Sequence, residues 1–249
     1  MILSLENAIS FKRCIDAISV LIDEAEFSIT ENGLELRATD PSQISMIDFK
    51  INKSAFKQFD VKEDIKLGID IGYLSQILGR AKKDDSISLD LNATKSSLNV
   101  TFSVGNSKRA FSVPLIDISQ AQLPSLNIDF DSTITLKADS IKEAMKDAAL
   151  ISSYVVILAQ ADKFVAEANS SKGHLVNEIS AKDAAIKEFK VRKECRSMFP
   201  LEYLQNMLKA AESNDFIEIS MKNNAPIRIF YPIGKAEITY YLAPRIETE

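Results

Sequence analysis

The chain has 249 residues, of which 46 % are hydrophobic and 26 % are charged, and its formal net charge at pH 7 is −5. This composition is typical of a globular protein, and the length suffices for two domains of ordinary size. The acidic balance argues against a protein whose whole surface binds nucleic acid, but it allows a local basic face.

No apolar run approaches the roughly 20 residues of a membrane span, and no basic-then-apolar leader opens the chain. The two cysteines, Cys14 and Cys195, are expected to be reduced and structural. We therefore expect a cytoplasmic protein that does not enter a membrane.

The first half predicts two helices among short strands. Asn7–Glu24 is the first helix, because its apolar residues recur at helical spacing. Gly72–Lys83 is the second, with Tyr73 on its apolar side, and Asp84-Asp85 after it is expected to form a turn. The strand candidates are Met1–Leu5, Glu26–Thr30, Leu34–Ala38, Gln43–Ile51, Ile65–Ile71, Ser86–Leu91, Ser97–Val104 and Lys108–Val113. The inward face of Gln43–Ile51 stays ambiguous.

Pro114–Asp129 has no helical period and contains two prolines. It is much longer than the roughly 4–6 residues of an ordinary connection, so we interpret it as a tether between two domains. The second half then repeats the order of strands and helices, with helices expected at Asp139–Ser152 and Pro200–Ala211.

The repeat is visible in the sequence itself. Tyr73-Leu74 recurs as Tyr203-Leu204, and Asp85–Leu89 corresponds to Asp215–Ile219, each pair being 130 positions apart. Self-similarity at this distance indicates two domains of one fold. The predicted class is α+β, with antiparallel sheets and two helices on one face of each domain. The domains are predicted at residues 1–113 and 130–249, joined by a connector at 114–129.

Basic side chains recur on the polar sides of the predicted helices. On spacing alone, solvated amphipathic helices with i,i+4 pairs are the ordinary interpretation of such residues. If the four helices share a face, however, these side chains would form a sequence-independent contact for phosphates. The candidate DNA-binding residues are Lys12, Arg13, Arg80, Lys82, Lys83, Lys142, Lys146 and Lys209.

Two further features remain open on pattern alone. The apolar C-terminal segment Pro226–Ile246 is either ordinary core with a frayed end or, with the tether, a patch for a partner. Lys108–Val113 and His174–Ser180 are either inner strands or sheet edges that pair with another subunit.

Catalytic signals are absent from the sequence. His174 is the only histidine, no cysteine pair has metal-ligand spacing, and no glycine-rich phosphate loop or nucleophile elbow occurs. We predict that the protein is not an enzyme and uses no cofactor or metal.

Three segments, Val20–Ala25, Leu36–Met46 and Tyr241–Glu247, resemble the DNA polymerase sliding clamps of the proliferating cell nuclear antigen family. The Asp-Pro-Ser segment and the Leu-Ala-Pro ending carry the resemblance, which covers the whole chain and is nearest to archaeal members. It implies rings of three two-domain subunits with helices around a central hole. It also implies duplex DNA, DNA polymerase, the clamp loader (replication factor C), flap endonuclease and DNA ligase as partners.

The resemblance also implies two protein-binding surfaces. The partner pocket beside the connector would use Thr39, Ile44, Met46, Leu123, Pro124, Pro226, Tyr241, Ala243 and Pro244. Subunits would pair through edge strands that contain Arg109, Phe111, Val113, Leu175, Val176 and Ile179.

The chain departs from the family at three helix positions. Gln76 and Gly79 stand where many members have lysine, and Glu143 stands where some have arginine, which puts individual DNA contacts in doubt. The sequence thus predicts a DNA sliding clamp and processivity factor, associated with the nucleoid. The alternatives are a protein-only scaffold, one subunit of a heterotrimer, or an enzyme with an unrecognised site.

Overall fold

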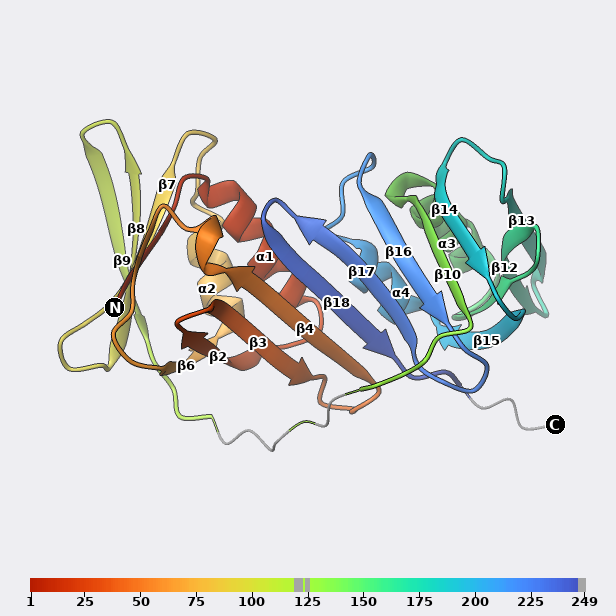
Figure 1. Cartoon of the computed structure of the whole chain (residues 1–249), viewed down its shortest axis with the longest axis horizontal. Helices are drawn as coiled ribbons and strands as arrows, with labels where there is room; N and C mark the ends of the chain where they lie inside the picture. Colours follow the sequence, from red (N-terminus) through yellow and green to blue (C-terminus); the bar gives the residue numbers. More distant parts are fainter. Residues whose placement is uncertain (119–122, 124–125, 246–249) are drawn as a thin grey trace. The chain divides into compact units, whose positions relative to one another are not determined.

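The computed structural model describes residues 1–118, 123 and 126–245. The chain divides into two compact units (Figure 1). Unit 1 comprises Met1–Pro41, Ile47–Pro124 and Pro232–Ile238, and unit 2 comprises Ser42–Met46, Ser125–Tyr231 and Thr239–Glu249.

Unit 1 contains two packed α-helices, α1 (Ala8–Ser19) and α2 (Ile71–Leu78), and a short 3-10 helix, η1 (Lys53–Ala55). One of its sheets has the strand order β5-β1-β7-β8-β9, and a second run of neighbours has the order β4-β3-β2-β6. The strands are β1 (Ile2–Leu5), β2 (Glu24–Thr30), β3 (Gly33–Thr39), β4 (Ser45–Asn52), β5 (Gln58–Asp60), β6 (Ile65–Asp70), β7 (Ser86–Leu91), β8 (Ser97–Val104) and β9 (Ser107–Pro114).

Unit 2 contains the packed helices α3 (Ala138–Ile151) and α4 (Leu201–Leu208). Its strands follow the orders β13-β12-β11-β15 and β14-β10-β16-β17. They are β10 (Ser132–Lys137), β11 (Tyr154–Ala159), β12 (Lys163–Ser170), β13 (Gly173–Ser180), β14 (Ile186–Val191), β15 (Cys195–Pro200), β16 (Phe216–Met221) and β17 (Ile227–Ile233). The last strand, β18 (Ala236–Leu242), has residues in both units, as β4 and β17 do.

The internal repeat predicted from the sequence is confirmed, and equivalent backbone hydrogen bonds occur in the two units. In unit 1 the amide of Ala8 donates to the carbonyl of Asp85 at 2.9 Å, and in unit 2 the amide of Ala138 donates to the carbonyl of Asp215 at 2.8 Å. Each bond joins the first residue of a long helix to the residue just before a strand, β7 or β16. The two-unit α+β prediction is therefore correct.

Both helices of unit 1 end earlier than their apolar pattern predicts. Asn7 caps α1 by accepting the Ser10 amide at 2.9 Å, and the helix ends at Ser19 rather than at Glu24. Asp70 likewise caps α2 through the Tyr73 amide at 2.8 Å, and this helix ends at Leu78 with Gly79 as its C-cap. Apolar residues beyond each end remain partly or fully buried, which is why spacing alone overextended both helices.

The turn predicted at Asp84-Asp85 is present after α2, and it is built around a buried aspartate. Asp85 is 1 % exposed, accepts the Lys82 amide at 2.7 Å and forms an ion pair with Arg109 of β9. Arg109 also donates to the carbonyl of Arg80 at 2.8 Å and lies over the ring of Phe102. These contacts fix the edge strand β9 to the turn.

The strand β4 settles an ambiguity that the sequence left open. Ile47, Phe49 and Ile51 are all buried, so the odd-numbered residues face the core of unit 1. Met46, which belongs to unit 2, is buried as well.

The predicted tether is attached at both ends in the described residues. On the unit 1 side, the amide of Ile116 donates to the carbonyl of Gly68 in β6 at 3.0 Å. A Cβ atom on Gly68 would lie only 2.0 Å from the Ile116 carbonyl oxygen, so this close approach requires glycine. On the unit 2 side, Arg192 forms an ion pair with Asp129 at 2.7 Å.

Candidate nucleic-acid interface and docking surfaces

Lys12 and Arg13 lie side by side on α1, where the sequence predicts DNA contacts. Lys12 forms an i,i+4 ion pair with Asp16, and Asp16 also accepts the Ser75 hydroxyl of α2 at 2.9 Å. Asp16 therefore joins the two helices, while both basic side chains keep partial exposure. Tyr73 of α2 is 42 % exposed, contrary to its predicted place on the apolar side.

The prediction that Arg80, Lys82 and Lys83 lie on a helical face is wrong, because α2 ends before them. All three are exposed in the turn that leads to β7. The anchored backbone of this turn, held by Asp85 and Arg109, presents a compact cationic group next to the end of α2.

Two basic residues of unit 2, Lys142 and Lys146, make contacts within their unit, as Lys12 does in unit 1. Lys142 donates to the carbonyl of Ala211 and, at 3.5 Å, to that of Lys209, so it holds the end of α4. Lys146 forms an ion pair with Glu143 at 2.6 Å, and this hydrogen bond raises the pKa of Lys146. Lys209 is the exposed C-cap of α4.

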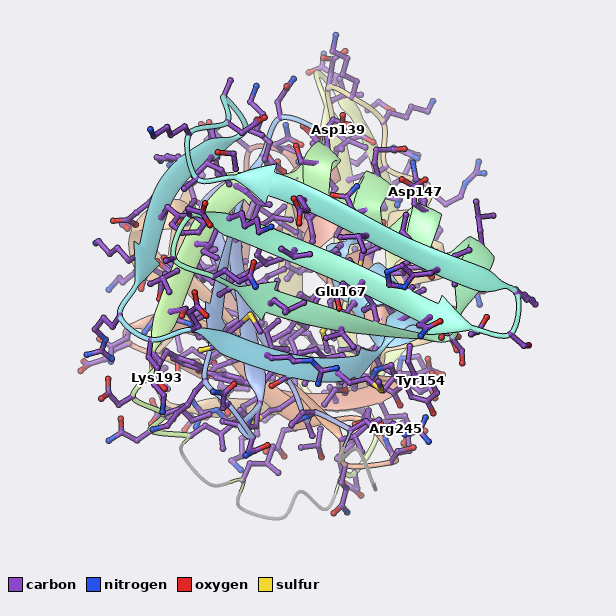
Figure 2. The ribbon with its side chains drawn as sticks, turned by 90° about the vertical axis from the view of Figure 1, so that its right-hand side faces the viewer. Asp139, Asp147, Tyr154, Glu167, Lys193 and Arg245 are labelled. Atoms are coloured by element: carbon purple, nitrogen blue, oxygen red, sulfur yellow. The ribbon has the colours of Figure 1, made fainter. Side chains whose placement is uncertain are left out.

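Acidic side chains also crowd the helices of unit 2. Asp139, Glu143 and Asp147 are exposed on α3, and Glu202 is exposed on α4. Figure 2 shows Asp139 and Asp147 along the same helix. The exposed faces of the unit 2 helices are therefore not basic, in contrast to α1 and the turn after α2.

The residues expected in the partner pocket are distributed over both units. Ile44, Met46, Pro226, Tyr241, Ala243 and Pro244 belong to unit 2, and Thr39 and Leu123 belong to unit 1. Pro124 lies outside the described residues. Except for buried Met46, the described members are half-buried, as a surface with accessible apolar side chains requires.

Within unit 2 the segment after β18 is held in place. The amide of Ala243 donates to the carbonyl of Ile44, and that of Arg245 donates to the carbonyl of Met198, both at 2.8 Å. The Arg245 guanidinium lies over the ring of Tyr154, 4.2 Å from its centre. Both residues are labelled in Figure 2. The C-terminal segment is therefore anchored up to Arg245, and the prediction of a frayed end is not met in this stretch.

The two strands predicted as edges do lie at the ends of their sheets. β9 ends the order β5-β1-β7-β8-β9, and β13 ends the order β13-β12-β11-β15. Phe111, Leu175 and Ile179 are half-buried, and Val176 is 44 % exposed. Two predicted interface side chains face inward instead. Val113 is fully buried, and Arg109 is engaged by Asp85, so only the backbone of Val113 is available for pairing.

Sequence reasoning missed several exposed apolar residues, namely Val104, Leu126 and Leu150. Leu150, near the end of α3, is 74 % exposed, the highest value among the large apolar side chains described. α3 contacts β13, so Leu150 and the edge strand belong to one region of unit 2. The helical spacing of the sequence could have indicated this exposure. Leu150 does not lie on the helical face formed by the buried residues Ile141, Ala144, Met145 and Ala148.

No group of three or more histidine, cysteine, aspartate or glutamate side chains in the described residues could hold a metal ion. His174 is exposed on β13. Cys14 is buried, which raises the pKa of its thiol to about 12. None of the described helices is both long and apolar enough to cross a membrane.

Two compact units of the same topology, each with a helix pair and an antiparallel edge strand, are the architecture of the two-domain DNA clamps. Sequence comparison agrees over nearly the whole chain. Residues 1–123 match the N-terminal domain, and residues 125–246 the C-terminal domain, of proliferating cell nuclear antigen. The chain therefore belongs to the proliferating cell nuclear antigen family, which is a family of non-enzymatic clamps.

Curated relatives are archaeal proteins named DNA polymerase sliding clamp. One from Methanococcus maripaludis is 34 % identical over 247 residues, covering 97 % of this chain and 98 % of its own length. One from Pyrococcus furiosus is 31 % identical over 243 residues, covering 97 % of each chain.

Solved structures share the fold. The proliferating cell nuclear antigen of Thermococcus kodakaraensis aligns with a TM-score of 0.93 at 21 % identity, over 98 % of this chain and 99 % of its own. That of Archaeoglobus fulgidus (A. fulgidus), solved with the C-terminal region of FEN-1, aligns with a TM-score of 0.88 at 29 % identity, over 100 % and 99 %. A complex of two different family members, PCNA2 and PCNA3 of Sulfolobus tokodaii, aligns with a TM-score of 0.90 at 25 % identity, over 99 % and 100 %.

Proposed function

We propose that this chain is a subunit of a ring that encircles duplex DNA and tethers DNA polymerase and other replication and repair enzymes to it. The observation that carries the proposal is the pair of sheet edges, β9 in unit 1 and β13 in unit 2. Two different edges on one chain favour head-to-tail contacts, which close into a ring when the rotation allows it.

The subunit contact is assigned to these strands and to Leu150. Backbone pairing between β9 and the partner's β13 would satisfy the edge hydrogen bonds of both strands. Val176 and Leu150 supply exposed apolar surface in the same unit. Three identical chains are the simplest ring. The Sulfolobus tokodaii complex of two different members supports a heterotrimer as the second candidate.

The DNA contact is assigned mainly to unit 1. Five of the candidate basic residues, Lys12, Arg13, Arg80, Lys82 and Lys83, belong to unit 1, and three, Lys142, Lys146 and Lys209, belong to unit 2 beside the exposed acidic residues of α3. The acidic residues of α3 would also hold phosphates away from unit 2. We keep Lys142, Lys146 and Lys209 as weaker candidates, because screened contacts at longer range still contribute.

A closed ring does not require tight binding to DNA, since topology retains it. Lysine and arginine contacts to phosphates carry no sequence information and weaken steeply with salt, which is compatible with sliding. The absence of charge on α2 between Ile71 and Leu78 fits such weak binding.

Partner enzymes are proposed to dock with the pocket residues on either side of the connector. Leu123 and Pro244 would offer apolar contacts to short docking motifs, and the further residues assigned to this contact are Thr39, Ile44, Met46, Pro124, Pro226, Tyr241 and Ala243. The Archaeoglobus fulgidus structure, in which a family member is bound to the C-terminal region of FEN-1, supports this assignment. Few anchors dominate the affinity of such sites.

Functionally, we divide the chain into residues 1–113, a connector at 114–129 and residues 130–249. Polymerase, flap endonuclease, DNA ligase and the clamp loader are the expected partners. The protein would act in the cytoplasm at the nucleoid.

The DNA assignment is tested by two matched double variants. Lys12→Ala with Arg13→Ala removes two proposed phosphate contacts, and Lys142→Ala with Lys146→Ala removes the same charge from unit 2. DNA affinity is measured by fluorescence anisotropy from low to moderate salt, along with polymerase processivity.

We expect the unit 1 variant to reduce the steepness of log affinity against log salt by roughly two, at about 0.9 per phosphate contact. We also expect the polymerase to make shorter DNA products with this variant. The unit 2 variant should change both much less. Equal effects of the two variants would refute the asymmetry. A wild-type protein that binds no DNA and does not stimulate polymerase would instead favour the protein-only scaffold.

A further inference from the structure

Unit 1 contains a cavity of about 340 Å³ that has no part in the functions proposed above. Three segments enclose it: the start of α1, the stretch around η1, and the turn between β17 and β18. All of its lining residues belong to unit 1. In Figure 1 these segments lie toward the top of unit 1, whereas the start of the connector, Leu115–Ile118, lies at the bottom of the same unit.

The floor of the cavity is apolar. Phe11, Ile51 and Ile233 line it and are buried by the rest of the unit, and Phe56 is half-buried beside them. A pocket of a few hundred Å³ with an apolar floor and a small number of polar groups is the usual form of a binding site. An apolar group that fills it would contact this floor and would remove the exposed parts of Leu5, Ala55 and Phe56 from water.

The turn that closes one wall has a defined geometry. Gly234 has a φ of +59°, in the left-handed region that favours glycine. A Cβ atom on Gly234 would lie 3.7 Å from the side chain of Ser10, so the turn lies directly over the first part of α1.

The rim of the cavity carries positive charge. Lys57 and Lys235 both line it and are exposed, and neither has a side-chain ion pair within the described residues. Glu6 is the only acidic residue among the lining side chains. The start of α1 adds the partial positive charge of a helix N-terminus. In a chain of net charge −5, this rim is a local site of the opposite sign.

We propose that this cavity is a second docking site, which takes an acidic segment of a partner protein with one large apolar anchor side chain. The anchor would occupy the floor formed by Phe11, Ile51 and Ile233, and flanking aspartate or glutamate residues would lie against Lys57 and Lys235. The separation of an apolar floor from an exposed cationic rim suits a peptide, in which anchor and charges sit on different residues. Few anchors with charged flanks are sufficient for specific recognition.

The probe is the peptide acetyl-Asp-Asp-Trp-Asp-Asp-amide. The chain has no tryptophan, so all tryptophan emission comes from the peptide. We expect a saturable blue shift of that emission. We also expect chemical-shift changes at the methyl groups of Ile51 and Ile233 in the full-length protein. Peptides with alanine in place of tryptophan, or with lysine in place of aspartate, should not bind.

Reversing the rim charges tests the site without disturbing the core. Lys57→Glu with Lys235→Glu should weaken binding by about ten-fold or more, whereas Lys62→Glu, an exposed lysine outside the cavity, should leave it unchanged. Leu123→Glu with Pro244→Glu should also leave it unchanged, because those residues belong to the connector pocket.

Several results would overturn the proposal. These are no saturable binding, binding that survives the reversal of both rim charges, or binding lost in the connector-pocket variant. Equal affinity for indole-3-acetate would also overturn it, since a free small molecule would then suffice. None of these measurements depends on DNA or on ring closure. A negative result for this site would therefore not contradict the clamp function, and a negative result for the clamp function would not contradict this site.

Discussion

The buried aspartate of unit 1 allows a quantitative test against its own counterpart in unit 2. Asp85 is 1 % exposed and accepts hydrogen bonds from the Lys82 amide at 2.7 Å and from the Arg109 guanidinium. Asp215 stands at the equivalent position, is half-buried and accepts the Glu212 amide at 2.7 Å. Alanine at each position thus removes a similar hydrogen bond from a backbone amide. The two carboxylates differ in burial, which is nearly complete for Asp85 and partial for Asp215.

The magnitude follows from these contacts. A hydrogen bond to a charged group contributes about 1.5–3 kcal/mol, and Arg109, which is partly exposed, can recover some hydration when Asp85 is lost. We therefore expect Asp85→Ala to cost about 3 kcal/mol and Asp215→Ala about 1 kcal/mol. At roughly 4 °C per kcal/mol for a unit of this size, Asp85→Ala should lower Tm by about 12 °C and Asp215→Ala by about 4 °C.

The effect should also depend on pH. Burial raises the pKa of the Asp85 carboxyl, but hydrogen bonds from Lys82 and Arg109 outweigh burial and hold it below the ordinary value of 3.8. A lowered pKa in the folded state means that the contribution is complete above about 3.8 and is lost as the pH falls below it. The difference between wild type and Asp85→Ala should therefore shrink in acid.

Differential scanning calorimetry from pH 7 down to pH 3 gives both quantities, with solution mass checked for each variant. Equal Tm losses for Asp85→Ala and Asp215→Ala would refute the reasoning from burial. A Tm difference that stays constant down to pH 3 would refute the assignment to an ionised carboxylate.

Three further outcomes are expected. Leu150→Glu should shift the assembly toward monomers in light scattering while Ala149→Glu does not, and a wild-type mass for Leu150→Glu would remove this residue from the subunit contact. Leu123→Glu with Pro244→Glu should abolish binding of a partner docking peptide in calorimetric titration with the ring intact, and unchanged affinity would contradict the pocket. The Cys14 thiol should resist alkylation at pH 8 because burial raises its pKa to about 12, and stability should fall as the pH rises above about 9, where only the unfolded thiol ionises; a Cys14→Ala variant with the same alkaline decline would exclude this cause.

Much of the fold follows from local patterns in the sequence. β7 and β8 begin and end at the predicted residues, because alternating apolar positions are bounded by clear turns. The repeat was detectable because equivalent residues such as Tyr73 and Tyr203 keep a constant separation. The helix ends could not be detected in the same way. Ile22 is buried although it lies beyond the end of α1, so the apolar spacing continues into a turn that is not helical.

The candidate sites depend more on contacts between distant residues. The spacing of Lys142 and Lys146 gives no sign that one holds the end of α4 and the other pairs with Glu143. The partnership of Asp85 with Arg109 joins a turn to an edge strand, and no local pattern predicts it. The cavity in unit 1 is assembled from three separate segments, so only the folded chain reveals it.

The most direct test of encirclement is the retention of the protein on DNA whose ends are open or closed. A duplex is tethered to a surface at one end, the protein threads over the free end, and that end is then blocked with streptavidin. A closed ring predicts that the protein stays on the blocked duplex after dilution into moderate salt and leaves within moments when a restriction enzyme removes the block. Equal dissociation from blocked and open duplexes would contradict encirclement and leave only ordinary electrostatic binding.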